Sequence, residues 1–174
     1  MFRQRHEASF EAPIATVFTA LLRVLAPRRW ASESWFEAEQ SRPPVGRRYV
    51  SRNGALVRRG RIVECLQPVL LTLYETLFDP PCRVRLRLRW RLEPQEIGTS
   101  LLLDARYELN APAYLNRRHW REEIYGHCSR MLSAVHSALA EEGYQGVGVR
   151  GQRIGRSTIT VTNTIAVNGK PTFK

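Results

Sequence analysis

The sequence predicts an α+β protein in which a curved antiparallel sheet of about six to seven strands wraps around a long C-terminal helix, with two short helices after the first strand. Three observations predict this architecture. Between residues 36 and 109, apolar and polar side chains alternate with period two, as they do in strands. The connections are of hairpin length, whereas parallel neighbours need crossovers of about a dozen residues or more. A last apolar stripe has helical spacing and ends at Gly143.

The chain begins with an expected strand and an amphipathic helix. Residues 5–13 are an extended segment that ends at Pro13, a residue suited to the first turn of a helix. The apolar positions of the next segment recur with helical spacing: Ile14, Val17, Phe18, Leu21, Leu22 and Leu25. Pro27 ends this helix, and residues 28–35 are expected to form a second short one. Because the apolar residues are periodic and follow an acidic, strand-like segment, we interpret residues 14–26 as part of the mature fold and not as a signal peptide.

Period-two alternation and turn residues then mark the strands. Five segments are expected as strands: 47–52, 56–66, 69–78, 83–92 and 99–109. Asn53-Gly54 lies between the first two, and this dipeptide readily supplies the positive φ of a tight hairpin turn.

The segment RVRLRLRWRL, residues 83–92, alternates without interruption. If its apolar side chains face the helix, its five arginines face water, because successive side chains of a strand point to opposite faces. Asp104 and Glu108 of the next strand are expected opposite or diagonal to arginines 85–89, where each opposite-charge pair contributes about 0.2–1 kcal/mol. Trp90 lies on the apolar side, so stacking aromatics are missing among these arginines. We interpret the row as mainly a solvated scaffold face, with a nucleic-acid surface as the alternative.

The last strong element is a helix from about Pro112 to Gly143. Its apolar stripe comprises Trp120, Ile124, Cys128, Met131, Leu132, Val135 and Leu139. Residues 144–174 are rich in glycine and threonine, and we place them as a basic tail outside a core domain of residues 1–143. GVGVRGQRIG (146–155) is predicted to be a linker, because no strand-loop-helix context surrounds it. The rest of the tail is expected to form one strand or hairpin, or to be disordered.

The charge, the apolar runs and the cysteines of the chain indicate which partners and which compartment to expect. The net charge is +11, so a nucleic acid or an anionic membrane surface is considered as a partner. Only two of the 27 basic residues are lysine, an arginine bias that coding composition also produces. No apolar run approaches the roughly 18–20 residues that span a bilayer. Cys65, Cys82 and Cys128 form no CxxC pair and fit reduced thiols in a cytoplasmic protein.

Four stretches together resemble the helix-grip fold of the START-like (SRPBCC) superfamily, which includes polyketide cyclase/dehydrase and lipid-transport families. These stretches are ASFEAPIATVFTALL (8–22), RRWASESW (28–35), GRIVECLQPVLLTLYETLFDPP (60–81) followed by RLRW (87–90), and the helix from about residue 112. The resemblance covers roughly residues 5–142. It implies an apolar cavity between sheet and helix that holds a hydrophobic small molecule such as a lipid, quinone or polyketide. No cofactor and no metal are expected.

Polar residues on the apolar side of the sheet are the candidates for chemistry. Alternation puts Glu75 in an apolar row, where it could donate a proton or anchor a ligand; in the alternative, Tyr74 faces inward and Glu75 faces water. Tyr107 could offer its hydroxyl to a ligand or be a core residue. His127 adjoins the apolar stripe and could reach the cavity or lie at its rim. The predicted ligand-pocket residues are Leu73, Glu75, Leu86, Leu88, Trp90, Leu103, Tyr107, Trp120, Ile124, His127 and Cys128.

Other chemistries have weaker support in the sequence. His119, His127 and His136 are spaced by eight and nine residues, which is not the i, i+4 spacing of a helical zinc motif. No catalytic nucleophile motif is present. The leading hypothesis is therefore binding, or transport, of a hydrophobic small molecule. The alternatives are a cyclase/dehydrase-like lyase or isomerase that uses Glu75, Tyr107 or His127, and a basic protein that docks on nucleic acid, ribosomes or anionic lipid.

Overall fold

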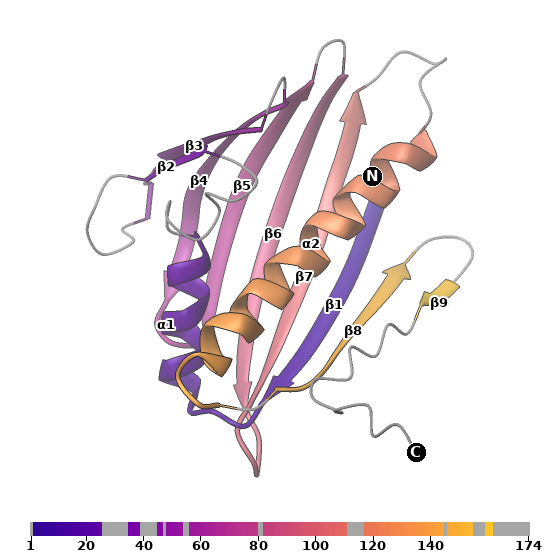
Figure 1. The fold of residues 1–174 in the computed structure, drawn as a ribbon. Helices are drawn as coiled ribbons and strands as arrows, with labels where there is room; N and C mark the ends of the chain where they lie inside the picture. Colours follow the sequence, from indigo (N-terminus) through magenta and orange to yellow (C-terminus); the bar gives the residue numbers. More distant parts are fainter. Residues whose placement is uncertain are drawn as a thin grey trace, which may run out of the picture.

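The computed structural model describes residues 2–25, 35–38, 45–46, 48–53, 56–79, 82–110, 117–144, 146–154 and 159–161. Within these residues, nine strands form one antiparallel sheet in the order β2-β3-β4-β5-β6-β7-β1-β8-β9. The elements are β1 Phe2–Phe10, α1 Ile14–Leu25, β2 Trp35–Ala38, β3 Arg48–Asn53, β4 Leu56–Leu66, β5 Leu70–Asp79, β6 Cys82–Pro94, β7 Thr99–Asn110, α2 Arg117–Ala140, β8 Gly146–Ile154 and β9 Ile159–Val161. Figure 1 shows α2 crossing one face of the curved sheet, with α1 beside its C-terminal end.

The predicted class and the antiparallel sheet are confirmed, but the expected six to seven strands were too few. Trp35 begins β2, so it does not belong to the second short helix that was predicted; the rest of that prediction, residues 28–34, lies outside the described residues. The prediction of a linker at residues 146–155 is wrong over residues 146–154, which form β8.

β8 pairs antiparallel with β1, and β9 extends the sheet by one more strand. Strand pairing joins backbone groups, so a glycine-rich segment can satisfy the edge of β1 without an alternating side-chain pattern. The division of the chain at residue 143 into a domain and a tail remains a prediction.

The central strands have the predicted faces and register. Arg85 lies opposite Glu108 and Arg89 opposite Asp104 in the β6–β7 hairpin. All five predicted inward residues of β6 are buried: Val84, Leu86, Leu88, Trp90 and Leu92. These side chains pack with buried residues of both helices and form one continuous hydrophobic core.

Two helices cover the inner, concave face of the sheet. α1 buries Val17, Phe18 and Leu21 as predicted, but Ala20 and Val24 are also buried, whereas Leu22 and Leu25 are only partly so. The buried face of α1 is therefore rotated slightly from the predicted stripe. No described helix combines the length and the apolar character needed to cross a bilayer.

α2 begins at Arg117 in the described residues, and all seven residues of its predicted apolar stripe are buried. Its C-terminus is closed by a glycine, as predicted. Gly143 has a φ of +87°, its N–H donates to Ala140 O, and the N–H of Tyr144 donates to Leu139 O, both at 3.0 Å. This pair of bonds is the Schellman arrangement, which satisfies carbonyls at the end of a helix.

Candidate ligand site between the sheet and the C-terminal helix

The structure brings all eleven predicted ligand-pocket residues to the interior between the sheet and α2. Each of their side chains is at most 5% exposed. Most are leucine, isoleucine or tryptophan and belong to the continuous core. Their burial is thus established, while their contact with a ligand remains a prediction.

Glu75 faces this interior. Its residue exposure is 5%, whereas its neighbour Tyr74 is 43% exposed, so the alternative orientation of β5 is wrong. Glu75 Oε2 lies 3.7 Å from Arg58 Nε and 3.8 Å from His127 Nε2. Both separations are longer than a hydrogen bond, so charge and dipole attraction act across them. We call Arg58, Glu75 and His127 the buried charge cluster.

Arg58 reaches this cluster from β4. Gly60 lies directly opposite Glu75, and Arg58, two residues away, is on the same face as Gly60 and diagonal to Glu75. Arg58 was not among the predicted site residues, although the sequence contains a signal for it. In VRRGRI the alternation places Arg58 with Gly60 and Ile62, on the face opposite to Arg59 and Arg61.

His127 reaches the cluster from α2 and is 2% exposed, so it lies in the interior and not at the rim. Burial lowers the pKa of His127 well below its ordinary value, and the charges of Arg58, Arg130 and His6 lower it further. The imidazole is therefore neutral near pH 7. Because the positive charge of Arg58 is matched by the negative charge of Glu75, the buried charge cluster has little net charge.

Tyr107 and residues of β1 extend the polar surroundings. Gln4 donates from Nε2 to the Tyr107 hydroxyl at 3.3 Å and to the Arg121 carbonyl at 3.1 Å, which links β1, β7 and α2. The ring of His6 lies 4.8 Å from that of Tyr125. Gln4 and His6 are each 1% exposed. Neither was among the predicted site residues, although both share the alternation of the buried apolar residues of β1.

Cys128, also among the predicted pocket residues, has a thiol of low reactivity. Burial and the nearby charge of Glu75 raise the pKa of its thiol to about 12. A protonated thiol is a poor nucleophile and a poor metal ligand. In the part of the chain that the structure describes, no three His, Cys, Asp or Glu residues are grouped closely enough to hold a metal ion.

A curved antiparallel sheet that holds a C-terminal helix against an apolar face defines the helix-grip class of proteins. Solved structures with this chain's fold include the Mll3558 protein from Rhizobium loti, with a TM-score of 0.60 and 16% identity over 78% of this chain and 95% of that one. Ara h 8.0201 gives a TM-score of 0.57 and 14% identity over 79% and 97% of the two chains.

A third similar structure is DynU16, a protein in the dynemicin biosynthetic locus. Its TM-score is 0.55 and its identity 16%, over 79% of this chain and 47% of DynU16. No protein-family model and no curated protein sequence matches this chain. At such identities the similarity shows the fold alone, and on that level the resemblance noted in the sequence is confirmed.

Proposed function

We propose that this protein is a binding or carrier protein for a hydrophobic small molecule, which it holds between the sheet and α2. The observation that carries the proposal is the buried charge cluster, which adds charged and polar groups to a largely apolar interior. Ligand sites typically combine an apolar lining with a small number of placed polar groups. The helix-grip fold supports the same function, because the resemblance implies a hydrophobic ligand between these elements.

The charge of the cluster indicates the class of ligand. Arg58 and Glu75 offset one another and His127 is neutral, so the three residues offer no net positive charge to a ligand carboxylate. We therefore expect an uncharged ligand with hydroxyl or keto oxygens. Quinones, long-chain alcohols and polyketides belong to this class.

The first experiment is to purify the full chain without organic solvent, denature it and identify released small molecules by mass spectrometry. A neutral oxygenated hydrophobic compound in stoichiometric amount is the expected result. An empty protein that also takes up nothing from a mixed lipid and quinone extract would overturn the proposal.

A specificity switch tests the cluster itself. Glu75→Gln removes the carboxylate beside Arg58, so the ratio of affinities for a fatty acid over the alcohol of equal length should rise by about tenfold or more. The affinities are measured by displacement of the fluorescent dye anilinonaphthalene sulfonate. Arg85→Gln, on the opposite face of the sheet, is the matched control and should leave the ratio unchanged. An unchanged ratio in Glu75→Gln would place the ligand away from the cluster.

A second candidate is the cyclase/dehydrase-like enzyme, and one observation favours it: a neutral imidazole lies 3.8 Å from a carboxylate, a combination suited to proton abstraction. The probe is 2-tetralone, whose α-proton exchange in deuterated water is followed by NMR. An enzyme of this kind accelerates the exchange, and His127→Asn abolishes the acceleration. Binding of the ketone without accelerated exchange would favour the carrier.

A further inference from the structure

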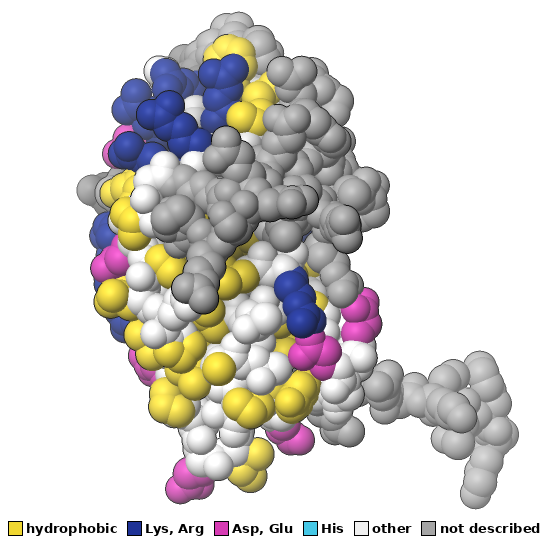
Figure 2. All heavy atoms as spheres, turned by 90° about the vertical axis from the view of Figure 1, so that its left-hand side faces the viewer, with side chains coloured by type: hydrophobic (Ala, Val, Ile, Leu, Met, Phe, Trp, Pro, Cys, Tyr) yellow, Lys and Arg dark blue, Asp and Glu magenta, His cyan; other side chains and the backbone are white. Residues whose placement is uncertain are grey.

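The convex face of the sheet carries a second candidate site, separate from the interior. β4 and β6 direct Arg59, Arg61, Arg83, Arg85 and Arg87 outward, and these residues line a groove of about 840 Å³. Arg48 of β3 and Arg106 of β7 border it on either side. Figure 2 shows basic side chains gathered at one end of the molecule, along the edge where this face is seen in profile.

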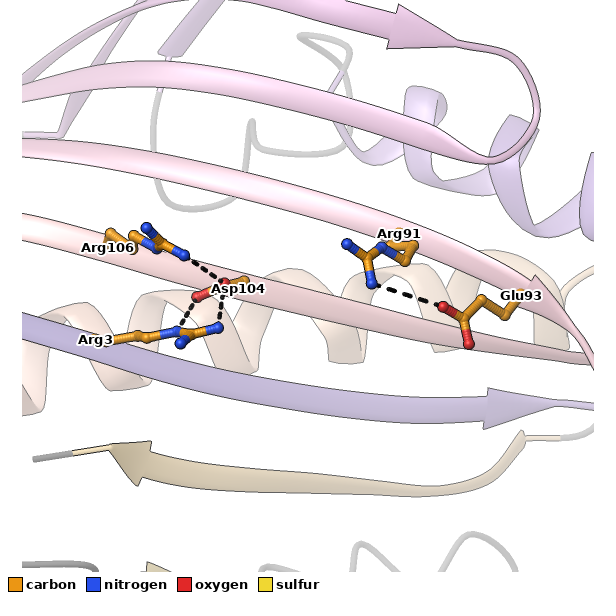
Figure 3. Close-up of polar contacts among 5 residues, drawn as sticks. All are labelled: Arg3, Arg91, Glu93, Asp104 and Arg106. Atoms are coloured by element: carbon orange, nitrogen blue, oxygen red, sulfur yellow. Dashed lines mark hydrogen bonds and ion pairs between the residues drawn. The ribbon is translucent and has the colours of Figure 1, made fainter.

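The arginines of the outer face differ in whether they form ion pairs. Outside the groove, two arginines of this face are paired: Arg3 donates to both oxygens of Asp104 at 2.9 and 2.7 Å, and Arg91 lies 3.8 Å from Glu93 (Figure 3). In the groove, Arg83 and Arg85 form no ion pair with any described carboxylate. Arg85 is opposite Glu108 in register, as predicted, but no ion pair joins them. Glu108 also lines the groove, and among the described residues the arginines of the lining outnumber its carboxylates.

Aromatic side chains lie among these arginines. β5 runs between β4 and β6 and exposes Tyr74 by 43% and Phe78 by 48%. Tyr74 is opposite Arg87 and Phe78 is opposite Arg83. The Arg87 guanidinium carbon lies 5.9 Å from the centre of the Tyr74 ring. The sequence-based statement that this face has no stacking aromatics is wrong, because the aromatics come from the neighbouring strand.

We propose that this groove binds single-stranded nucleic acid, with arginines on the phosphates and with Tyr74 in the groove and Phe78 beside it, opposite Arg83, stacking on bases. Sheet platforms of this kind stack two or three bases on exposed aromatics, and arginines beside them hold the backbone. A duplex keeps its bases stacked inside and would leave both rings unused. An anionic bilayer is flat, and it would not fill a groove that crosses from β3 to β7.

The test measures fluorescence anisotropy of labelled oligouridylate and oligothymidylate, each about 12 nucleotides long, with the full chain. We expect saturable binding that weakens with salt, by a slope of about 0.7 per phosphate neutralised. Tyr74→Ala should weaken binding about tenfold with little change in this slope. Arg85→Gln should weaken binding and reduce the slope by about 0.7. Phe78→Ala is a second test of stacking.

Arg91→Gln is the matched control, because Arg91 shares the strand and the face but is outside the groove. It should leave affinity and slope unchanged. Equal affinities for the two oligonucleotides, or a preference for oligouridylate through its 2′-hydroxyls, would each support the proposal. Three results would overturn it: no saturable binding, equal losses in Arg91→Gln and Arg85→Gln, or binding only to phosphatidylglycerol vesicles. Because the groove is on the opposite face from the buried charge cluster, its failure would leave the proposed ligand site untouched.

Discussion

At the scale of single residues, Glu75 and Arg58 depend on each other. Their side chains are 3% and 11% exposed, so neither charge is well solvated. Removing one partner of a buried ion pair leaves the other charge buried without it and lowers the free energy of unfolding by about 3–5 kcal/mol. Replacing both partners with apolar residues is often neutral or stabilising. We therefore expect Glu75→Gln to lower the free energy of unfolding by about 3 kcal/mol, and the double change Arg58→Met with Glu75→Leu to recover most of this loss. Urea denaturation of the two variants measures both effects.

The exposed pair of Arg91 and Glu93 is the control for that cycle. Its side chains are 48% and 62% exposed, and exposed pairs contribute about 0–1 kcal/mol. Arg91→Gln should change the free energy of unfolding by less than about 0.5 kcal/mol. A double variant no more stable than Glu75→Gln would show that the interior needs the polar groups themselves.

His127 links stability to pH. Its pKa is lowered in the folded state by burial and by Arg58, Arg130 and His6, although the Glu75 carboxylate also faces it. The unfolded chain therefore binds a proton on this residue at a higher pH than the folded chain does. The stability from His127 is complete above about pH 6.5 and falls below it, by about 1.4 kcal/mol per pH unit.

Urea denaturation of the wild type and of His127→Leu at several pH values checks this expectation. The variant should lose this part of the pH dependence, whereas the change of an exposed histidine at the start of α2, His119→Gln, should retain it. Identical pH profiles in the wild type and His127→Leu would contradict the assignment of a buried neutral imidazole.

At the scale of elements, the hairpin between β6 and β7 requires glycine at its end. Gly98 has a φ of +91°, and a Cβ there would lie 1.9 Å from the carbonyl oxygen of Phe10. Gly46 has a similar φ of +94°, but a Cβ would meet no atom of the described residues within 4 Å. We expect Gly46→Ala to cost about 1–2 kcal/mol for backbone conformation alone, and Gly98→Ala to cost clearly more. Thermal denaturation compares them, and equal losses would mean that β1 moves aside freely.

The contribution of β8 is also tested at this scale. Removing residues 146–174 exposes the edge of β1, which an unpaired strand offers to other chains. The shortened chain should melt at a lower temperature and self-associate, as measured by circular dichroism and light scattering. An unchanged melting temperature in a monomeric protein would instead support the predicted domain of residues 1–143.

The alternation of side chains within one strand and the pairing across the β6–β7 hairpin could be interpreted from the sequence alone, and the other relations between strands could not. The inward row of β6 follows from local pattern, and so does the stripe of α2. Tyr74 among the arginines required the register of β5 against β6. β8 has no local strand pattern, because its pairing depends on the backbone edge that β1 offers. The partners of Glu75 come from β4 and α2, far apart in the chain, so no spacing could have predicted the buried charge cluster.

At the scale of the whole molecule, the single sheet separates the arginine groove on its convex face from the buried charge cluster on its concave face. Tyr74, Glu75 and Thr76 follow one another on β5; Tyr74 and Thr76 face the groove, and Glu75 faces the core. The convex face has exposed cations, while the interior has charges that offset one another under an apolar cover. At ordinary ionic strength, salt ions screen the exposed arginines of the convex face over about 10 Å, whereas they screen the buried charges of the interior very little.

Salt therefore distinguishes the two proposed sites. Raising the salt concentration about tenfold should release most of a bound oligonucleotide, because its counterions compete for the groove. The same change should leave a hydrophobic ligand in the interior, since apolar burial does not depend on charge and a buried pair is weakly screened. Native mass spectrometry of protein exchanged from both salt conditions measures ligand retention, and anisotropy measures the oligonucleotide. If the hydrophobic ligand were lost in parallel with the oligonucleotide, it would be held by the arginines of the convex face and not by the helix-grip interior.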